Sequence, residues 1–377
     1  MNLKLKQFID VYIGRFALFF HLIAVRFLGV ILNRNHSINR APKNIVIIKI
    51  LGLGSVLMAT DAIYSLKLKY PNAKLTLICG KGVSIGIEPL NLFDQIWVID
   101  DKNVFVLFKT ALQTLLKTWK LKNIWVADLE VYSILTTLFS AWTFAINRYG
   151  FQLDKTHFRN YLNTHNIYLN QFILVTTNYE KLVESMGVSE ITIFHFPQSI
   201  RPIEKKENTI FINNTCSELG GNLRKLTPEI LTQICNYIID STSYKIAFVG
   251  APSDKHEIDK FLNINQLNVE RVENIAGRFN FKEYYNYLAI HAKCMLSIDS
   301  APLHIANKLN IPSVSFWGPI NPSQRLKDTK NAYYIEKACS PCIHHTEMIP
   351  CGGNNVCMKD MEIKHIITLI NSIINNE

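Results

Sequence analysis

The sequence has few of the residues that break regular structure. Its 377 residues include only 16 glycines and 13 prolines, which excludes collagen-like and low-complexity architectures. Apolar residues make up 48% of the chain and charged residues 19%, so disorder is excluded as its main state. The sequence also lacks an internal repeat. A chain of this length and composition is expected to fold as two domains of ordinary size.

Acidic residues are outnumbered by basic ones. The chain has 30 Asp and Glu against 40 Lys and Arg, a net charge of +10 that indicates an anionic partner. Residues 1–43 hold seven basic residues and one acidic residue, Asp10, so this segment carries a charge of +6. On the rest of the chain we find no grouping of basic and aromatic residues of the kind that lines a nucleic-acid groove. Nucleic acid is therefore not expected as a partner.

The amino-terminal segment lacks an apolar run of the length that a membrane span needs. Residues 8–32 are rich in Phe, Ile and Leu, but the longest stretch without Asp, Glu, Lys or Arg is 16–25, where a span needs about 20 residues. Arg15 and Arg26 could still reach opposite surfaces of a bilayer, so a span stays open. We prefer a basic amphipathic helix within residues 1–43, lying in the cytoplasmic interface on anionic lipid. The alternative is a soluble helix packed on the body. A cleaved signal peptide is disfavoured because charges interrupt the apolar region.

Short apolar runs alternate with helical patterns through the rest of the chain. Strands are expected at 44–50, 74–79, 95–99 and 123–127, then at 209–212, 245–249, 294–298 and 313–316, with a final helix at 363–375. The charged stretch 198–208 reads as a linker. The pattern predicts an α/β fold of two facing Rossmann-like domains, 44–200 and 201–377. Such sheets bind ligands outside the carboxyl ends of their strands, so the turns there are the candidate sites.

The first of these turns contains Gly52, Gly54 and Ser55. It begins like a dinucleotide-binding fingerprint, but Leu57 stands where the third glycine would be, and no acidic residue ends the second strand. An NAD-dependent enzyme is therefore disfavoured. The glycines either let the backbone approach a ligand closely or serve the tight turn alone.

A second turn follows the strand at 294–298 and contains Asp299, Ser300, Pro302 and His304. Ser300 can cap the next helix, and Pro302 suits its first turn. A helix amino terminus offers free N–H groups and a positive dipole end to a phosphate, and His304 lies one turn on along the same face. The alternative is an ordinary capped helix with a buried histidine.

Further polar residues lie at strand ends of the second half. Arg224 and Lys225 precede a predicted helix and could bind a diphosphate, Arg224 by a bidentate fork. Asp254 could bind ribose hydroxyls, and Gly318 closes the same rim. Each of them alone could be a solvated surface residue. Together with Thr215 they predict an anion-binding crevice on the second half.

Taken in order, these stretches resemble glycosyltransferase family 9, the ADP-heptose:lipopolysaccharide heptosyltransferases. The resemblance spans about residues 44–370, and its pieces are 47–59, 70–74, 128–130, 148–150, 249–254, 298–306, 312–319 and 339–358. Its most specific part is the Asp-Ser-x-Pro-x-His-x-Ala stretch at 299–306. The resemblance implies a GT-B fold in which the amino-terminal domain holds the acceptor and the carboxy-terminal domain the donor. It also implies an inverting, metal-independent sugar transfer that requires no cofactor.

The partners implied by this resemblance are a nucleotide-sugar donor, with ADP-heptose favoured, and a lipid-linked glycan acceptor of lipopolysaccharide biosynthesis. Together with the basic segment 1–43, which lies outside the resemblance, this predicts a cytoplasmic enzyme associated peripherally with the inner face of the plasma membrane. By position, Thr215 and Arg224 resemble the family's donor-phosphate contacts; the family usually has Lys where Arg224 stands, so Lys225 is a second candidate. Asp254 resembles the family's ribose-binding acidic residue. The donor-site motif is carried by Asp299, Ser300 and His304.

The first turn departs from the family's pattern. The family has Gly-Asp there, and that Asp is the proposed general base, whereas this chain has Gly54-Ser55. A serine hydroxyl cannot accept a proton near neutral pH without a base of its own. Glu130 or Asp128, at the end of the strand at 123–127, is the next candidate base. Alternatively Asp128 caps the following helix, and without a base the protein would be a slow or degenerate transferase.

Eight cysteines are present, four of them clustered near the carboxyl terminus. Cys339, Cys342, Cys351 and Cys357 have the spacing C-x2-C-x8-C-x5-C. We expect reduced structural thiols first, a structural zinc second because four thiolates can hold it tetrahedrally, and disulfides third because they need an oxidising compartment.

Three functions follow from these observations. The first is inverting transfer of heptose or a related sugar from ADP-heptose or another nucleotide-sugar to a lipopolysaccharide core or glycolipid. The second is an enzyme of another class on the same fold, such as a nucleotide-sugar epimerase. The third is a non-catalytic glycan-binding relative, which the missing Gly-Asp keeps open.

Overall fold

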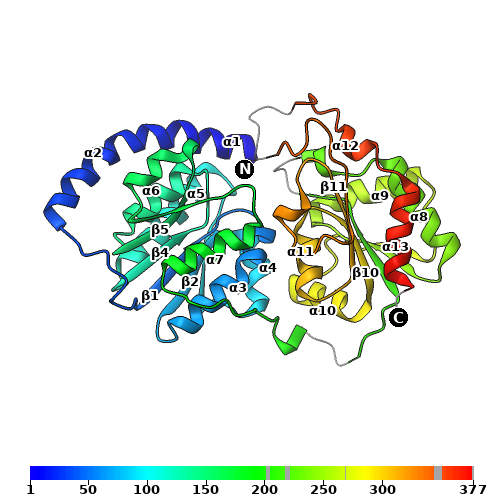
Figure 1. The fold of residues 1–377 in the computed structure, drawn as a ribbon, viewed down its shortest axis with the longest axis horizontal. Coiled ribbons are helices and arrows are strands. Elements are labelled where there is room, and N and C mark those ends of the chain that lie inside the picture. Colours follow the sequence, from blue (N-terminus) through cyan, green and yellow to red (C-terminus); the bar gives the residue numbers. More distant parts are fainter. Residues whose placement is uncertain (201–203, 217–220, 268, 344–349, 376–377) are drawn as a thin grey trace. The chain divides into compact units, whose positions relative to one another are not determined.

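The structure is a computed structural model that describes residues 1–377 except 201–203, 217–220, 268, 344–349 and 376–377. The chain divides into two compact units, Met1–Phe194 and His195–Glu377 (Figure 1). Unit 1 includes the basic amino-terminal segment, and the division lies shortly before the boundary expected between residues 200 and 201.

Unit 1 is built on a six-stranded parallel sheet in the order β3-β2-β1-β4-β5-β6. The strands are β1 (Asn44–Ile48), β2 (Lys74–Gly80), β3 (Gln95–Ile99), β4 (Ile124–Asp128), β5 (Asn147–Gln152) and β6 (His165–Tyr168). The central strand β1 pairs in parallel with β2 and β4 and is almost wholly buried. A near-continuous apolar run such as 44–48 suits this position because helices cover both faces.

Helices cover both faces of this sheet. They are α3 (Leu53–Lys69), α4 (Lys81–Ile87), α5 (Val104–Trp119), α6 (Ile134–Trp142) and α7 (Val175–Ser185), with short helices η2 (Glu88–Leu90) and η3 (Asp154–Tyr161). Right-handed crossovers place α3 and α4 on one face, because the chain moves outward from β1 to β3 there. They place α5 and α6 together on the other face, because the chain then moves in the opposite direction (Figure 1).

The amino-terminal segment is helical and packs on α6. It comprises α1 (Leu3–Phe8), the π-helical turn η1 (Ile9–Ile13) and α2 (Gly14–Leu32). The carboxylate of Asp10 accepts hydrogen bonds from Ser133 Oγ at 2.7 Å and from the backbone N–H groups of Ile134 and Leu135 at 3.0 and 2.9 Å. Of the residues that the structure describes, only Lys4–Leu32 form a helix long and apolar enough to cross a membrane.

Unit 2 repeats the same design. Its six-stranded parallel sheet has the order β12-β11-β10-β7-β8-β9. The strands are β7 (Thr209–Asn213), β8 (Lys245–Phe248), β9 (Val272–Asn274), β10 (Ala292–Ile298), β11 (Ser313–Trp317) and β12 (Ala332–Tyr334). The α-helices are α8 (Pro228–Ser241), α9 (Lys255–Ile264), α10 (Phe281–His291), α11 (Ala301–Lys308), α12 (Val356–Lys359) and α13 (Ile363–Ile374). The short helices are η4 (Gln198–Ile200), η5 (Gly221–Arg224), η6 (Pro252–Asp254) and η7 (Pro322–Gln324).

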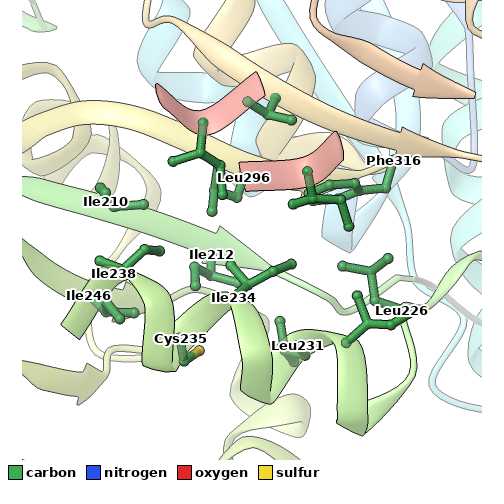
Figure 2. Packing of buried hydrophobic residues seen from close by; sticks show 14 of the residues in the cluster. Ile210, Ile212, Leu226, Leu231, Ile234, Cys235, Ile238, Ile246, Leu296 and Phe316 are labelled. Carbon is green, nitrogen blue, oxygen red and sulfur yellow. The ribbon is translucent and has the colours of Figure 1, made fainter. Parts of the chain in front are cut away.

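The core of unit 2 packs the sheet against helices that include α8 and α13. Figure 2 shows Ile210 and Ile212 of β7 over Ile238 and Ile234 of α8, and Leu296 of β10 belongs to the same cluster. These side chains are 2% exposed or less. Burying each contributes roughly 1.5–3 kcal/mol relative to exposure. The packing holds the carboxyl ends of β7 and β10 in fixed places.

Both sheets have the strand order of a Rossmann-like fold. In each, the third strand in chain order is at one edge, the first lies beside the fourth, and the sixth is at the other edge. Successive strands are therefore added first toward one edge of the sheet and then toward the other. The point at which this order reverses lies between β1 and β4 in unit 1 and between β7 and β10 in unit 2. Ligands of doubly wound sheets bind at such switch points. The candidate ligand-binding residues are therefore those that follow β1 and β4 in unit 1 and those that follow β7 and β10 in unit 2.

Candidate functional site

Arg224 and Asp299 meet at the switch point of unit 2. Asp299 follows β10, and its Oδ2 lies 3.3 Å from Nη1 of Arg224, which also donates to the Asp299 carbonyl at 3.2 Å. The other carboxylate oxygen lies 3.6 Å from Nε2 of His304. All three side chains are largely buried. Three residues singled out in the sequence are thus brought into one cluster.

The charges around Asp299 favour its ionised form. Burial alone would raise the pKa of this carboxyl, but the hydrogen bond with His304 and the charges of Arg224 and Arg325 outweigh burial and hold its pKa well below the usual range. Asp299 is therefore an anion that orients Arg224 and His304. Arg325, from the turn after η7, was not singled out in the sequence, because no motif surrounds it.

The amino terminus of α11 begins at this cluster. Ser300 is the first flanking residue, but its hydroxyl donates to Asn213 Oδ1 at 2.5 Å and does not cap the helix. The prediction that the Ser300 side chain caps α11 is therefore wrong, because Asn213 at the end of β7 competes for it. With no acidic residue in the first turn either, the N–H groups of α11 keep their capacity for an external anion.

The Arg224 guanidinium also has unused capacity. Its Nε is buried and has no hydrogen-bond partner among the described residues. A buried donor without a partner costs free energy, and an anionic ligand would remove that cost. Arg224 and the α11 terminus are two independent indications of an anion at the same strand ends.

Thr215 and Asp254 lie on the other side of β7. Gly250, after β8, separates them: a Cβ atom there would lie 3.0 Å from Asp254 Cβ and 3.2 Å from Thr215 Oγ1. Asn213 Nδ2 donates to Thr215 Oγ1 at 3.1 Å, which connects this pair to Ser300. Beside η6 is a cavity of about 210 Å³, whose wall includes Pro252, Lys255, Asn274 and Gly277.

Cys216 follows Thr215 directly in the chain. Burial raises the pKa of its thiol against the charges of Arg224 and Lys225. Cys216 was not singled out in the sequence, since a single cysteine has no spacing to interpret.

Two predicted donor residues are engaged elsewhere. Lys225 Nζ lies 2.6 Å from a carboxylate oxygen of Glu257 in α9, and the Glu257 side chain is 62% exposed. Gly318 lies against α12: a Cβ atom there would be 2.6 Å from Cys357 Sγ. Its carbonyl accepts a hydrogen bond from Ser340 Oγ. Gly318 is therefore required for close packing of the cysteine segment.

Glu130 connects β4 to the first turn of unit 1. Its Oε1 accepts from the backbone N–H groups of Ile50 and Leu51 at 2.8 and 3.0 Å, and its Oε2 lies 2.8 Å from Lys49 Nζ. Burial alone would lower the pKa of Lys49, but Glu130 outweighs burial and raises it. Glu130 is partly exposed, with 15% of its side chain accessible.

Asp128 is fully buried and does not reach solvent. Its Oδ2 lies 2.8 Å from Nη2 of Arg159, which is equally buried, and its Oδ1 accepts from the N–H of Glu130 at 3.0 Å. Burial raises the pKa of Asp128 to about 6 against the opposing charge of Arg159. The alternative that Asp128 caps the following helix is wrong, because Ser133 and Asp10 cap α6. Asp128 supports the loop that carries Glu130.

Comparisons with known proteins agree with this geometry. A sequence model of glycosyltransferase family 9 (heptosyltransferase) matches residues 234–351. Lipooligosaccharide heptosyltransferase 2 of Campylobacter jejuni is 25% identical over 138 residues, which are 35% of this chain and 42% of that protein. The match thus spans less than half of that curated relative.

Solved structures match over most of the chain. A glycosyltransferase family 9 structure from Veillonella parvula has 17% identity and a TM-score of 0.69, covering 89% of this chain and 98% of that one. Escherichia coli ADP-heptose lps heptosyltransferase II has 15% identity and a TM-score of 0.64, covering 88% and 98%. Escherichia coli heptosyltransferase WaaC with ADP-2-deoxy-2-fluoro heptose has 13% identity and a TM-score of 0.63, covering 87% and 99%.

The resemblance to glycosyltransferase family 9 is confirmed. The predicted α/β fold of GT-B type with an amino-terminal apolar helix is confirmed as well.

The first turn shows where this chain departs from the glycosyltransferase family 9 pattern. Gly52 has a φ of +87°, in the left-handed region that favours glycine, and precedes α3. Gly54 and Ser55 lie in the first turn of that helix, and Ser55 donates its N–H to the Gly52 carbonyl at 3.0 Å. The carboxylate that contacts this turn is Glu130, through Leu51.

The cysteine segment of the family 9 resemblance lies partly outside the described residues, since 344–349 fall within it. Cys342 and Cys357 are buried. Burial raises the pKa of Cys357 to about 11. Outside the gaps in the description, no group of three or more His, Cys, Asp or Glu is placed to hold a metal ion.

Proposed function

We propose that this chain is an inverting glycosyltransferase that moves a sugar from a nucleotide-sugar to a lipid-linked glycan. The proposed donor is ADP-heptose, and the proposed acceptor is a lipopolysaccharide core or related glycolipid. The match of residues 234–351 to the family 9 model and the names of the matched heptosyltransferases support this choice. We also propose that the transfer needs no metal and that the four clustered cysteines are reduced and structural, with a structural zinc as the second reading.

One observation carries the proposal: Arg224 and the amino terminus of α11 converge at the switch point of unit 2. In the reaction, an acceptor hydroxyl oxygen attacks the anomeric carbon, and the bond from that carbon to the diphosphate oxygen breaks. The bonding electrons leave with the diphosphate. Arg224 and the N–H groups of α11 would stabilise this developing charge. Stabilisation of transition-state charge by fixed donors is usually the largest single contribution to catalysis. Asp254 would bind the ribose hydroxyls.

The acceptor hydroxyl must lose a proton, and Glu130 is our proposed base. It is a carboxylate with solvent access at the switch point of unit 1, whereas Asp128 is fully buried. Lys49 and two backbone N–H groups hold it in place. Because Gly54-Ser55 stands where the family has Gly-Asp, a degenerate, donor-binding relative remains the second candidate function.

A transfer assay with several nucleotide-sugars tests the proposal. The purified chain would be incubated with ADP-heptose, UDP-sugars and GDP-sugars, with and without a lipopolysaccharide-core acceptor, and release of the nucleotide diphosphate would be measured. We expect acceptor-dependent release from ADP-heptose. Donor binding without turnover would favour the degenerate relative, acceptor-independent conversion of the sugar would favour an epimerase, and no nucleotide-sugar binding would overturn all three.

The amino-terminal segment supports a proposed location on the inner face of the plasma membrane. Its helix is long and apolar, and residues 1–43 have a charge of +6 within a net charge of +10 for the chain. A lipid-linked acceptor would be reached from that surface.

A further inference from the structure

Helix α5 presents apolar side chains to solvent as well as to the sheet. Its inner side buries Thr114, Leu115 and Thr118. Its outer side exposes a stripe at a spacing of three or four residues: Phe105, Phe108, Leu112, Leu116 and Trp119. Phe105 is 76% exposed. The outer face of a surface helix normally carries polar residues, so a stripe of this kind marks an interaction site.

Helix α2 carries a second stripe of the same kind. One side of α2 packs on α6 through four residues: Ala17, Leu18, Leu22 and Val25. The opposite side exposes six large apolar residues: Phe16, Phe19, Phe20, Ile23, Phe27 and Val30. Val30 is 83% exposed. The helix therefore uses one face for unit 1 and leaves the other without a cover among the described residues.

The two stripes belong to one side of unit 1. Helix α2 lies along α6, and α5 lies beside α6 on the same face of the sheet (Figure 1). Lys6 of α1 pairs with Asp101, just before α5. At the other end, Trp119 Nε1 donates to the Trp142 carbonyl at 2.7 Å, and Trp142 Nε1 donates to His21 Nδ1 at 3.0 Å. We call the exposed stripes of α2 and α5 together the α2–α5 face.

Positive charge is concentrated around this face. Residues 102–122 contain five lysines and no acidic residue: Lys102, Lys109, Lys117, Lys120 and Lys122. All five are exposed. Residues 102–122 therefore have a charge of +5, and residues 1–43 have a charge of +6. Since the whole chain has a net charge of +10, the remaining residues together have a charge of −1. The one acidic residue of the amino-terminal segment, Asp10, is used to cap α6.

A basic cavity opens where α2 and α5 end. It measures about 610 Å³, and its wall includes Arg34, Arg40, Trp119 and Phe144. No Asp or Glu of the described chain lines it. Arg34 donates to the Phe144 carbonyl at 2.7 Å, which keeps its guanidinium at the rim. Aromatic and basic side chains together are the usual composition of a membrane–water interface.

We propose that unit 1 docks on an anionic lipid bilayer through the α2–α5 face, with α2 lying in the plane of the membrane. Apolar side chains of both helices enter the headgroup boundary, and the lysines beside α5 and the basic residues of 1–43 attract anionic headgroups. Helix α2 lies flat because its inner face is bound to α6. A spanning orientation would break the Asp10 and His21 contacts and expose the apolar residues of α6. The proposal deepens the membrane location given under the proposed function: it adds α5 and its lysines to the contact and fixes α2 flat, and it does not depend on the transferase activity.

Vesicle co-sedimentation of the full chain tests the proposal. Vesicles of phosphatidylcholine mixed with phosphatidylglycerol would be compared with vesicles of phosphatidylcholine alone, at low and high salt. We expect binding to the anionic vesicles that salt weakens. F105S/L112S and K109Q/K120Q each remove part of the α5 contribution without touching α2, and each should lower the partition coefficient roughly tenfold.

Matched controls lie on the opposite face of unit 1. L68S/I85S removes two comparably exposed apolar residues from α3 and α4, and K69Q/K181Q removes two exposed lysines from α3 and α7. Both should bind vesicles like the wild type, and thermal unfolding would confirm that every variant is folded. Equal binding by the α5 variants and the wild type, or no binding by the wild type, would overturn the proposal. So would a wild-type dimer that F105S/L112S converts to monomers, because a second copy would then cover the face. Stabilisation of each variant by ADP reports on the proposed function separately.

Discussion

Arg224 and Lys225 are neighbours in the sequence, but the structure gives them different partners. Arg224 reaches Asp299 at the switch point, whereas Lys225 pairs with an exposed glutamate of α9. We expect R224Q to lower kcat/KM for donor at least roughly a hundredfold, because it removes a cation from the leaving diphosphate. K225Q should stay within about threefold of the wild type, since an exposed ion pair contributes little. Initial rates at varied donor concentration measure both, and equal losses in the two variants would contradict this assignment.

Glu130 is the residue on which proton transfer depends in our proposal. E130Q keeps the shape and the backbone contacts of the side chain but cannot accept a proton. We expect kcat to fall by roughly 10²-fold or more, with ADP affinity unchanged. Turnover of E130Q at the wild-type rate would show that the base is another group.

The ionised state of Asp299 predicts a dependence of stability on pH. Its pKa is lower in the folded protein than in the unfolded chain, where it is about 3.9. Its contribution to the free energy of unfolding is therefore fully present above that pH and is lost as the pH falls below it. Urea unfolding of the wild type and D299N should give a constant difference from pH 7 to pH 5 that narrows below about pH 4. A difference that stays constant down to pH 3 would contradict the charge interactions assigned to Asp299.

At this scale the sequence predicted which residues lie together better than which contacts each one makes. Asp299, Ser300 and His304 meet as expected, because a motif in a strand–turn–helix context fixes its own local geometry, and Arg224 joins them from the short helix η5. Asp128 was misjudged, because its partner Arg159 is distant in the sequence and no local pattern announces a buried ion pair.

The helix α6 is held at its amino terminus by a residue from another element. Three hydrogen bonds to the Asp10 carboxylate join the amino-terminal segment to unit 1. We expect D10A to lower the free energy of unfolding of unit 1 by about 2 kcal/mol and to make residues 1–40 more sensitive to protease. K4A, an exposed change in the same segment, is the control and should leave both unchanged. Wild-type protease resistance in D10A would show that the apolar contacts alone hold the segment.

Element types were predictable where the apolar pattern is strong. All eight predicted strands are present, because each has an apolar run, and all but the edge strand β3 lie inside their sheet. The four missed strands have weaker patterns: β6 has four residues, β9 and β12 have three each, and β5 carries Asn147 and Arg148 within it. The exposed stripe of α5 was also missed, since its periodicity is that of any amphipathic helix and only the structure shows which face is buried.

At the scale of the whole molecule, two sheets of equal strand order place their switch points after β1 and β7. The alternation of strands and helices predicted this class of fold, because parallel strands need crossover helices. The sequence could not predict how Asn213 at the end of β7 takes the Ser300 hydroxyl away from α11. That contact leaves the helix terminus open to a ligand, and it depends on the register of β7 against β10.

A crystal structure of the chain with bound ADP tests the central claim most directly. The account predicts that the diphosphate lies at the carboxyl ends of β7 and β10, with oxygens in hydrogen-bond distance of the Arg224 guanidinium and of the first N–H groups of α11. A diphosphate bound away from both groups would contradict it.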